Sequence, residues 1–260
     1  EKMMEQQVRE AMQKHGINPP DNIIFDGVVH RFGKKDVGWY IMFDNGIHAG
    51  CFGDWSESSS YTWCSKNDSD FTPEERRQFR EQMELAKQKR EKEKLILQQE
   101  AKDIANRIWE SSQIASNHPY IERKRIKPCG IRTNKENLVI PLYNESGEIC
   151  SLQFIDHEGN KKFLSNGQVK DCYFRIGKPN GNVCIAEGFA TAATINEATG
   201  YAVIVAFNAG KLEACAKFVR ARMPKSNIII CADFDNVGIE KATSAAESVN
   251  GVMIYPDFGD

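Results

Sequence analysis

Three carboxylates follow two strand-like segments in the C-terminal third of the chain. Glu187 ends the apolar run 183–186, and Asp233 and Asp235 end the run 228–232. Each run leads into a helix-forming segment, which is typical of parallel strands buried on both faces. Because ligands of such sheets bind at the carboxyl ends of the strands, we expect the three carboxylates to share one functional edge.

The spacing of these acids indicates metal and phosphate chemistry. In an extended segment, residues two apart point the same way, so Asp233 and Asp235 can face one site while Phe234 turns into the protein. Crowded carboxylates raise one another's pKa, and a hard divalent cation such as Mg²⁺ relieves that repulsion. Gly188 and Gly238 each allow close backbone approach or a positive φ where a helix begins, and helix N-termini favour phosphate. Taken alone, Glu187 could be an ordinary helix cap, and the two aspartates could form an ordinary turn. The presence of both motifs in one alternating strand-helix unit favours a shared site.

The two motifs resemble the signatures of the Toprim domain, which topoisomerases, bacterial-type primases and some nucleases share. Longer stretches resemble the Toprim primases of conjugative plasmids and phages, and this resemblance is specific from about Asn117 to the end of the chain. The stretches that carry it are Ala186-Glu187-Gly188-Phe189-Ala190-Thr191-Ala192, 205–212 and 232–236.

The resemblance implies metal-dependent nucleotidyl transfer that makes short RNA primers on single-stranded DNA, with Mg²⁺ or Mn²⁺ as cofactor. Asn208 stands where an Asp is expected in many relatives, which counts against a metal role for that position. The implied partners are the DNA template, ribonucleoside triphosphates and a replicative helicase. The candidate catalytic residues and metal ligands are Glu187, Asp233 and Asp235, and the candidate cofactor-binding residues are Gly188, Gly238 and Lys211.

Three other functions use the same fold. A Toprim nuclease would use these acids with water as the nucleophile. A topoisomerase needs a tyrosine-bearing cleavage domain, and none of the seven Tyr has a recognisable setting. A non-catalytic module that binds DNA or recruits a partner within a larger replication protein is the non-enzymatic alternative, which the lack of a zinc-ribbon segment supports.

Composition predicts the cellular compartment of the protein and the kind of surface with which it could bind DNA. No apolar run in the 260 residues approaches the ~18 that a membrane span needs, so a cytoplasmic protein without membrane contact is expected. The eight cysteines form no CxxC pair, which indicates buried free thiols in a reducing compartment. A net charge of -2 means that DNA binding must come from local basic patches.

Residues 1–70 read as a small α+β domain with a helix at 2–15 and an antiparallel sheet. Asp44-Asn45-Gly46 lies between two alternating segments and predicts a hairpin. An aromatic cluster closes the sheet, and exposed rings among it would suit stacking of bases, although most such rings are core. A zinc site is the weaker alternative because the spacing lacks either knuckle of a ribbon. The aromatic residues are Trp39, Tyr40, Phe52, Trp55, Tyr61 and Trp63; the zinc candidates are His30, His48, Cys51 and Cys64.

The sequence of residues 71–260 predicts a linker and two further domains. Residues 71–116 form a long charged helix, residues 117–180 form a basic α+β subdomain of the primase core, and residues 181–260 form the Toprim domain with a central parallel sheet and flanking helices. We expect a third acid, Asp257 or Asp260, near a chain end that is cut from a longer protein. The candidate nucleic-acid-binding or nucleotide-binding residues are Arg123, Lys124, Arg125, Lys127, Arg132, Lys161 and Lys162.

Overall fold

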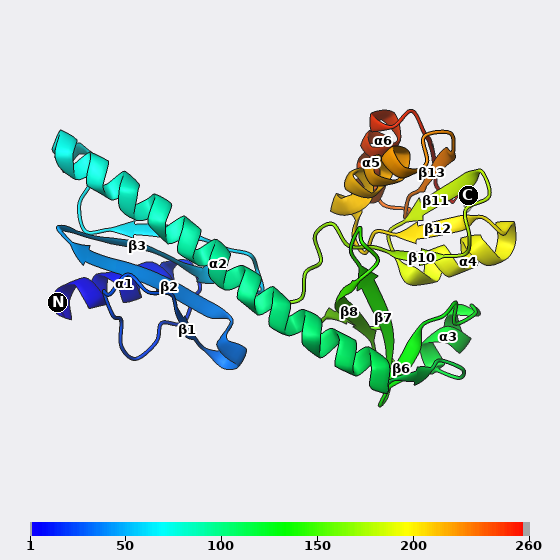
Figure 1. Cartoon of the computed structure of the whole chain (residues 1–260), viewed down its shortest axis with the longest axis horizontal. Coiled ribbons are helices and arrows are strands. Elements are labelled where there is room, and N and C mark those ends of the chain that lie inside the picture. The colour runs from blue at the N-terminus through cyan, green and yellow to red at the C-terminus, as the bar shows by residue number, and fades with distance from the viewer. Residues whose placement is uncertain (1, 257–260) are drawn as a thin grey trace. The chain divides into compact units, whose positions relative to one another are not determined.

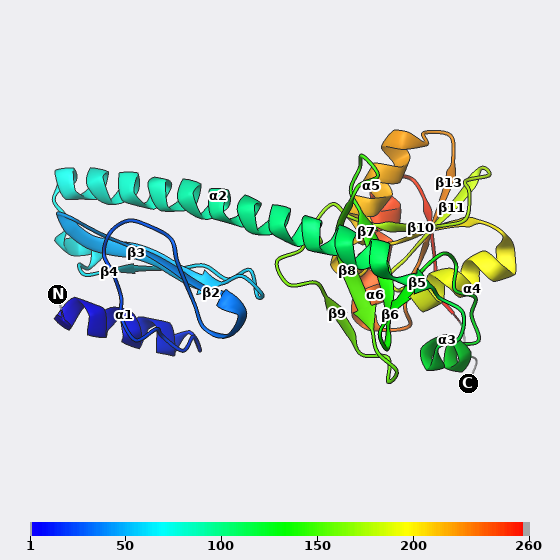
Figure 2. The same ribbon diagram turned by 60° about the horizontal axis from the view of Figure 1, so that its bottom comes forward.

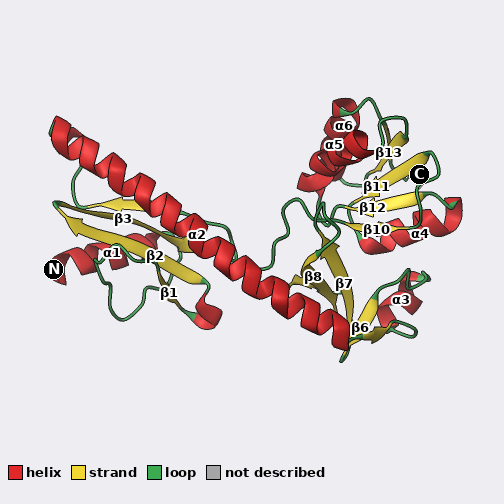
Figure 3. Cartoon of the chain, viewed as in Figure 1, coloured by secondary structure: helices red, strands yellow, loops and turns green. Residues whose placement is uncertain are grey.

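The computed structural model describes residues 2–256 and shows a mixed α/β architecture with three β-sheets (Figure 1; Figure 3). The backbone forms two compact units, Glu1–Leu97 and Gln98–Asp260. Each unit has its own hydrophobic core. None of the helices in residues 2–256 combines the length and the apolarity that crossing a bilayer requires.

The N-terminal unit contains an antiparallel sheet in the order β1-β2-β3-β4 and the helix α1 (Lys2–Lys14). The predicted hairpin is confirmed, because β2 and β3 pair up to Asn45 and Ile47 around Gly46, whose φ is 97°. This positive φ is open to glycine at little cost. The strands are β1 (His30–Phe32), β2 (Gly38–Asn45), β3 (Ile47–Asp54) and β4 (Tyr61–Cys64).

Successive side chains of β2 point to opposite faces of this sheet, and both faces are buried. Tyr40 and Met42 pack with residues of α1, whereas Trp39 and Ile41 lie in a second cluster with Ala86 of α2 (Pro73–Ser111). Figure 2 shows α1 and α2 on opposite faces of the sheet. The hydrophobic effect explains this sandwich, because a strand with two apolar faces needs a cover on each side.

Two hypotheses for this unit, base stacking by the aromatic cluster and zinc binding by the His and Cys candidates, are wrong for most of these residues. Four of the rings, Trp39, Tyr40, Phe52 and Trp63, are at most 9% exposed and belong to the core. His30 pairs with Asp26 and His48 pairs with Asp44. Within residues 2–256 no group of three or more His, Cys, Asp or Glu side chains could hold a metal ion.

A long helix, α2, lies within the predicted segment 71–116; it has 39 residues and ends at Ser111, before β5 (Gln113–Ile114). Thr72 and Glu75 form a capping box at its start: the Glu75 N–H donates to the Thr72 hydroxyl at 3.2 Å, and the Glu75 carboxylate accepts from the Thr72 N–H at 3.0 Å. The boundary between the two compact units, at Leu97 and Gln98, falls inside this helix.

The C-terminal unit contains an antiparallel sheet in the order β5-β6-β7-β8-β9 and the short helix α3 (Pro119–Lys124). Buried apolar side chains of β7 and β8 supply much of its core. The strands are β5 (Gln113–Ile114), β6 (Arg132–Asn134), β7 (Asn137–Tyr143), β8 (Ile149–Ile155) and β9 (Lys161–Phe163).

A second sheet of the same unit, which we call the C-terminal sheet, has the order β10-β12-β11-β13-β14. Its strands are parallel except β10, which pairs antiparallel with β12 and so joins this sheet although it falls within the predicted 117–180 subdomain. The strands are β10 (Phe174–Ile176), β11 (Asn182–Ala186), β12 (Ala202–Val205), β13 (Asn227–Cys231) and β14 (Val252–Ile254).

Both faces of the C-terminal sheet are covered, as the near-continuous apolar strands predict. On β11, Cys184 packs in the cluster that contains α4 (Phe189–Thr199), and Ile185 packs in the cluster that contains α5 (Leu212–Arg222) and α6 (Asn236–Ser248). Figure 1 shows α4 on one side of the sheet and α5 and α6 on the other. All eight cysteines are free and five of them are buried, in agreement with the sequence prediction.

Candidate active site

The three predicted carboxylates lie at the carboxyl ends of the two neighbouring strands β11 and β13. Ala186 and Cys231 are partners in the parallel register, so both strands leave the sheet at the same level. Glu187 follows the first strand directly and Asp233 follows the second after one residue. The fold therefore brings to one edge acids that are far apart in the sequence, as predicted.

Electrostatics shows that these groups act on one another. Burial raises the pKa of the Glu187 carboxyl, and the negative charges of Asp233 and Asp235 raise it further. The ammonium of Lys161, on β9, opposes this shift. The edge thus combines three carboxylates with one cation, and Glu187 binds a proton more readily than an exposed Glu does.

The Asp233–Gly238 segment is a tight turn into α6. Asp235 is the N-cap residue of this helix, and one of its carboxylate oxygens accepts a hydrogen bond from the Gly238 N–H at 2.6 Å. The Asp235 N–H donates to the Asp233 carbonyl at 2.9 Å. Asp235 is therefore a helix cap as well as a member of the acidic edge.

Phe234, which lies between the two aspartates, does not turn into the protein. It is 59% exposed and its ring packs against Tyr255 at a centroid distance of 6.0 Å. The prediction that it is buried was wrong because the segment is a turn, whereas the alternation rule applies to an extended strand.

Neither candidate glycine has a positive φ, and the two differ in how closely their neighbours approach. Gly188, the N-cap of α4, has a φ of -112°, and a Cβ built there would lie 3.5 Å from the Lys161 Nζ. A Cβ on Gly238 would lie 3.0 Å from the Asp233 carbonyl oxygen. Of the two predicted reasons for glycine, the positive φ applies to neither position, and close approach applies to Gly238, where an added Cβ would force its neighbours to move by a few tenths of an ångström.

Lys211 takes part in internal bonding. Its ammonium donates to the carbonyl of Val169 at 2.6 Å and to that of Cys172 at 2.7 Å. Burial lowers its pKa. Lys211 thus ties the loop before β10 to the start of α5 and has no hydrogen bond to the carboxylates among residues 2–256.

Phe207 is a residue at this edge that the sequence analysis missed. It has a φ of 71°, which is rare for a bulky side chain, and its N–H donates to the Glu187 carbonyl at 2.8 Å. Its ring contacts Phe163 of β9 edge-on. Only this strained backbone identifies it, and no spacing rule predicts a Phe in that conformation.

Six of the seven basic candidates are exposed, and three of the seven have hydrogen-bond or ion-pair partners within residues 2–256. Arg123 donates to the His157 carbonyl at 3.1 and 3.2 Å, and Lys127 pairs with Glu197 at 3.2 Å. Arg132 lies 4.3 Å above the Trp109 ring and donates to its carbonyl, so it supports the junction of β6 with α2. The exposed basic candidates are Arg123, Lys124, Arg125, Lys127, Lys161 and Lys162.

The donor chemistry at the acidic edge fits a hard divalent cation. Mg²⁺ takes one or two carboxylates and completes its shell with waters or phosphate oxygens, so a complete cage of protein ligands is unnecessary. This matters because no three His, Cys, Asp or Glu side chains in residues 2–256 form such a cage. Asn208 is exposed beside this edge at the start of the turn 209–211. The expected third acid, Asp257 or Asp260, lies outside the described residues.

The sheet and its acidic edge define a known class of domain. Residues 181–256 match the family model of the Toprim domain. This match covers both acidic motifs, all of α4 to α6, and the strands β11 to β14.

More particular relatives are two Escherichia coli proteins, each named DNA primase TraC. The chain is 30% identical to one over 277 residues, which covers 96% of this chain and 19% of the relative, and 29% identical to the other over 286 residues, which covers 98% and 26%. The chain therefore spans about a fifth to a quarter of the length of these curated relatives. The resemblance to plasmid-type Toprim primases is confirmed.

Among solved structures, the chain is similar to the primase fragment of the bacteriophage T7 primase-helicase protein. The sequences are 16% identical, the TM-score is 0.44, and the match covers 57% of this chain and 71% of that chain.

Proposed function

We propose that the chain is the catalytic part of a DNA primase that synthesises short RNA primers on single-stranded DNA. The observation that carries this proposal is the meeting of Glu187, Asp233 and Asp235 at one sheet edge inside the Toprim match. Similarity to proteins named DNA primase supports the primase over other Toprim activities.

In this proposal the three acids have different roles. Glu187, whose pKa is raised, accepts the proton of the primer 3′-hydroxyl and is the general acid–base residue. Asp233 and Asp235 hold one or two divalent cations, Mg²⁺ or Mn²⁺. When bound, such ions neutralise charge on the substrate phosphates and on the departing pyrophosphate. Gly238 keeps the turn tight, so that both aspartates stay at the edge.

Cationic residues around this edge bind the substrates. Lys161 faces Glu187 and binds a phosphate of the incoming ribonucleoside triphosphate. Template phosphates lie along the exposed basic residues Arg123, Lys124, Arg125, Lys127 and Lys162. Because Arg132 and Lys211 bond to backbone carbonyls, they act by holding the strands and loops that carry the site.

The proposed setting is plasmid or phage replication in the cytoplasm, with a replicative helicase as partner. The free thiols fit a reducing compartment.

Primer synthesis on single-stranded DNA with labelled ribonucleotides and Mg²⁺ or Mn²⁺ tests the proposal. Glu187→Gln and Asp233→Asn should each lower product formation by roughly 100-fold or more, because each removes a group that acts in the transition state. The matched control is Glu240→Gln, which removes one charge from an exposed position on α6 and should leave the rate unchanged.

Two results would contradict the proposal. DNA cleavage that depends on Glu187 and Asp233, without primer synthesis, would assign a Toprim nuclease. DNA binding without either activity would assign a non-catalytic module.

A further inference from the structure

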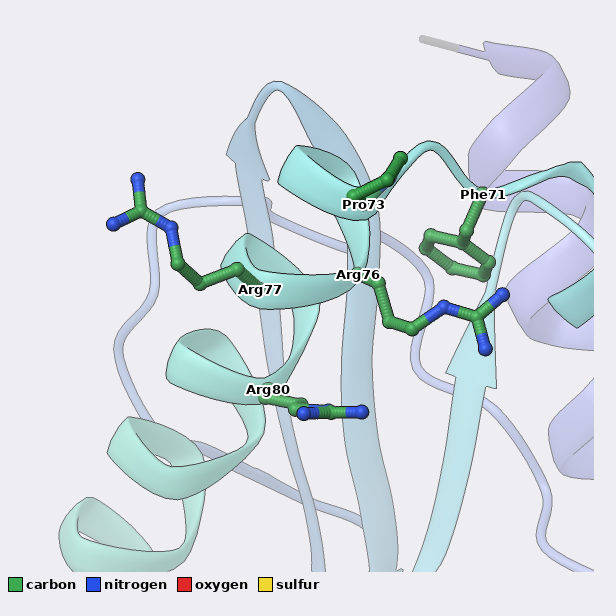
Figure 4. Close-up of a pocket in the computed structure, with 5 residues that line it drawn as sticks. All are labelled: Phe71, Pro73, Arg76, Arg77 and Arg80. Atoms are coloured by element: carbon green, nitrogen blue, oxygen red, sulfur yellow. The ribbon is translucent and has the colours of Figure 1, made fainter.

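A cavity of about 430 Å³ lies at the start of α2, in the N-terminal unit (Figure 4). It is lined by one aromatic ring, one proline and three arginines: Phe71, Pro73, Arg76, Arg77 and Arg80. We propose that this cavity, which we call the arginine pocket, binds the phosphodiester backbone of single-stranded nucleic acid while Phe71 stacks on a base. The site goes beyond the proposed catalytic function and needs neither metal nor ribonucleotide.

The arginines have the geometry for phosphate. Arg76 and Arg80 are four residues apart on α2 and therefore share a face of the helix. Figure 4 shows both side chains on the side of Phe71, whereas Arg77 extends the other way. A guanidinium presents paired N–H donors that match two phosphate oxygens, so two such groups on one face can hold neighbouring phosphates.

These two cations are available to a ligand. Arg76 donates from one guanidinium nitrogen to the Asp68 carbonyl at 3.0 Å, and its other terminal nitrogen lies 3.8 Å from the carboxylate of Asp68, whose side chain is 91% exposed. Exposed pairs of this kind are worth little, so a phosphate can replace the carboxylate. Arg80 makes no ion pair with any residue in the described range 2–256.

The chemistry of the pocket comes from side chains, because the capping box already uses part of the helix start. The Glu75 N–H donates to the Thr72 hydroxyl, the Thr72 N–H donates to the Glu75 carboxylate, and Pro73 has no N–H to offer. Glu75 is also bound by Lys66, and together these bonds lower its pKa to about 2. Glu74 pairs with Arg77 at 2.6 Å. The acids of the first turn are thus engaged, which leaves the Arg76 and Arg80 side to an anion.

Phe71 favours a single strand over a duplex. Its ring is half-buried and contacts Phe79 at a centroid distance of 5.5 Å, so its position is supported. Unpaired bases stack on such rings, whereas the bases of a duplex are stacked on one another. The volume lies in the range of pockets that take small ligands, which suits one nucleotide.

The test is fluorescence anisotropy of a labelled oligothymidylate with the full chain, without divalent metal or ribonucleotides, across ~50–200 mM salt. Arg76→Ala/Arg80→Ala should bind about 10- to 25-fold more weakly at ~0.1 M salt and reduce the salt slope by about 1.4, as expected for two lost phosphate contacts. The control Lys87→Ala/Lys92→Ala removes the same charge from exposed positions of α2 and should change the affinity less than twofold.

A second variant tests the aromatic part. Phe71→Leu keeps an apolar side chain beside Phe79 but should weaken binding of the single strand roughly fivefold or more, with little effect on a duplex of the same length. Primer synthesis is not measured, so failure of the proposed catalytic function would leave this result intact.

Three outcomes overturn the inference. Equal losses in both double variants would mean that α2 attracts DNA only through general charge. Unchanged binding in Arg76→Ala/Arg80→Ala would exclude the pocket from DNA binding. If polyglutamate binds in an Arg76- and Arg80-dependent manner while oligothymidylate does not, the pocket binds an acidic protein partner instead.

Discussion

At the level of single residues, Glu187 is a carboxylate whose ionised form is disfavoured at the acidic edge. Its pKa in the folded protein is raised by burial and by Asp233 and Asp235. In the unfolded chain the pKa returns to its ordinary value of 4.5. The ionised carboxylate therefore destabilises the fold at any pH above the raised pKa, and this cost disappears as the pH falls below 4.5.

Glu187→Gln should consequently stabilise the protein while it lowers the proposed primer synthesis. We expect the melting temperature to rise by about 1–2 °C at neutral pH, a small effect because the group is only partly buried and solvent screens it. Melting curves at neutral pH and below pH 4.5 measure this, and the two proteins should converge at low pH, where Glu187 is protonated in both states. A gain that persists at low pH would show a packing effect in place of the predicted charge repulsion.

Gly238→Ala should damage the site more than Gly188→Ala does. The added methyl group at Gly238 would lie 3.0 Å from the Asp233 carbonyl and 3.2 Å from an Asp235 carboxylate oxygen, whereas at Gly188 it would meet only the flexible end of Lys161 at 3.5 Å. Because small displacements of reacting groups are costly, primer synthesis should fall roughly 10- to 100-fold in Gly238→Ala.

The control for this pair is Ser244→Ala, an exposed position on the same helix. Rates and melting temperatures of the three variants should be measured together. If Gly188→Ala lost as much activity as Gly238→Ala, the close contact at Gly238 would not be the cause.

At the level of elements, Lys211 connects the loop before β10 to α5. Lys211→Met should lower the free energy of unfolding by about 1–3 kcal/mol, because the carbonyls of Val169 and Cys172 lose their common donor. Urea unfolding followed by circular dichroism measures the change. Lys217→Met, at an exposed position of α5, is the matched control and should have little effect. Similar losses in both variants would argue against a structural role for the Lys211 ammonium.

The sequence predicted those elements whose formation depends on local patterns. Apolar strands, helix starts and the Asp44-Asn45-Gly46 hairpin all carry short-range signals, and the acids at the ends of β11 and β13 followed from the parallel-sheet rule. Contacts between distant segments carry no such signal. The pairing of β10 with β12, the carbonyls bound by Lys211 and the backbone of Phe207 depend on packing that appears only in the folded chain.

At the level of the whole molecule, two compact units imply two unfolding events. Gly50 lies in the centre of β3, and a Cβ there would fall 2.1 Å from the Ile41 carbonyl oxygen. Gly50→Ala should therefore destabilise the N-terminal unit by about 3 kcal/mol or more. The C-terminal unit, which has its own cores, should keep its stability.

Tryptophan fluorescence reports mainly the N-terminal unit, since three of the four tryptophans, Trp39, Trp55 and Trp63, belong to it and only Trp109 belongs to the C-terminal unit. In Gly50→Ala the fluorescence transition should move to lower denaturant, while part of the circular dichroism signal should unfold as in the wild type. A single transition that shifts as a whole in both signals would mean that the chain unfolds as one cooperative body.

Two of the free cysteines can report on the opening of the structure around the candidate active site. Cys184 and Cys231 are buried in β11 and β13, the neighbouring strands that end at the acids. A buried thiol is alkylated only when the structure around it opens. The alkylation rates at these two positions in the native protein therefore measure how often the strands behind the acids separate, and substrate binding at the edge should slow them.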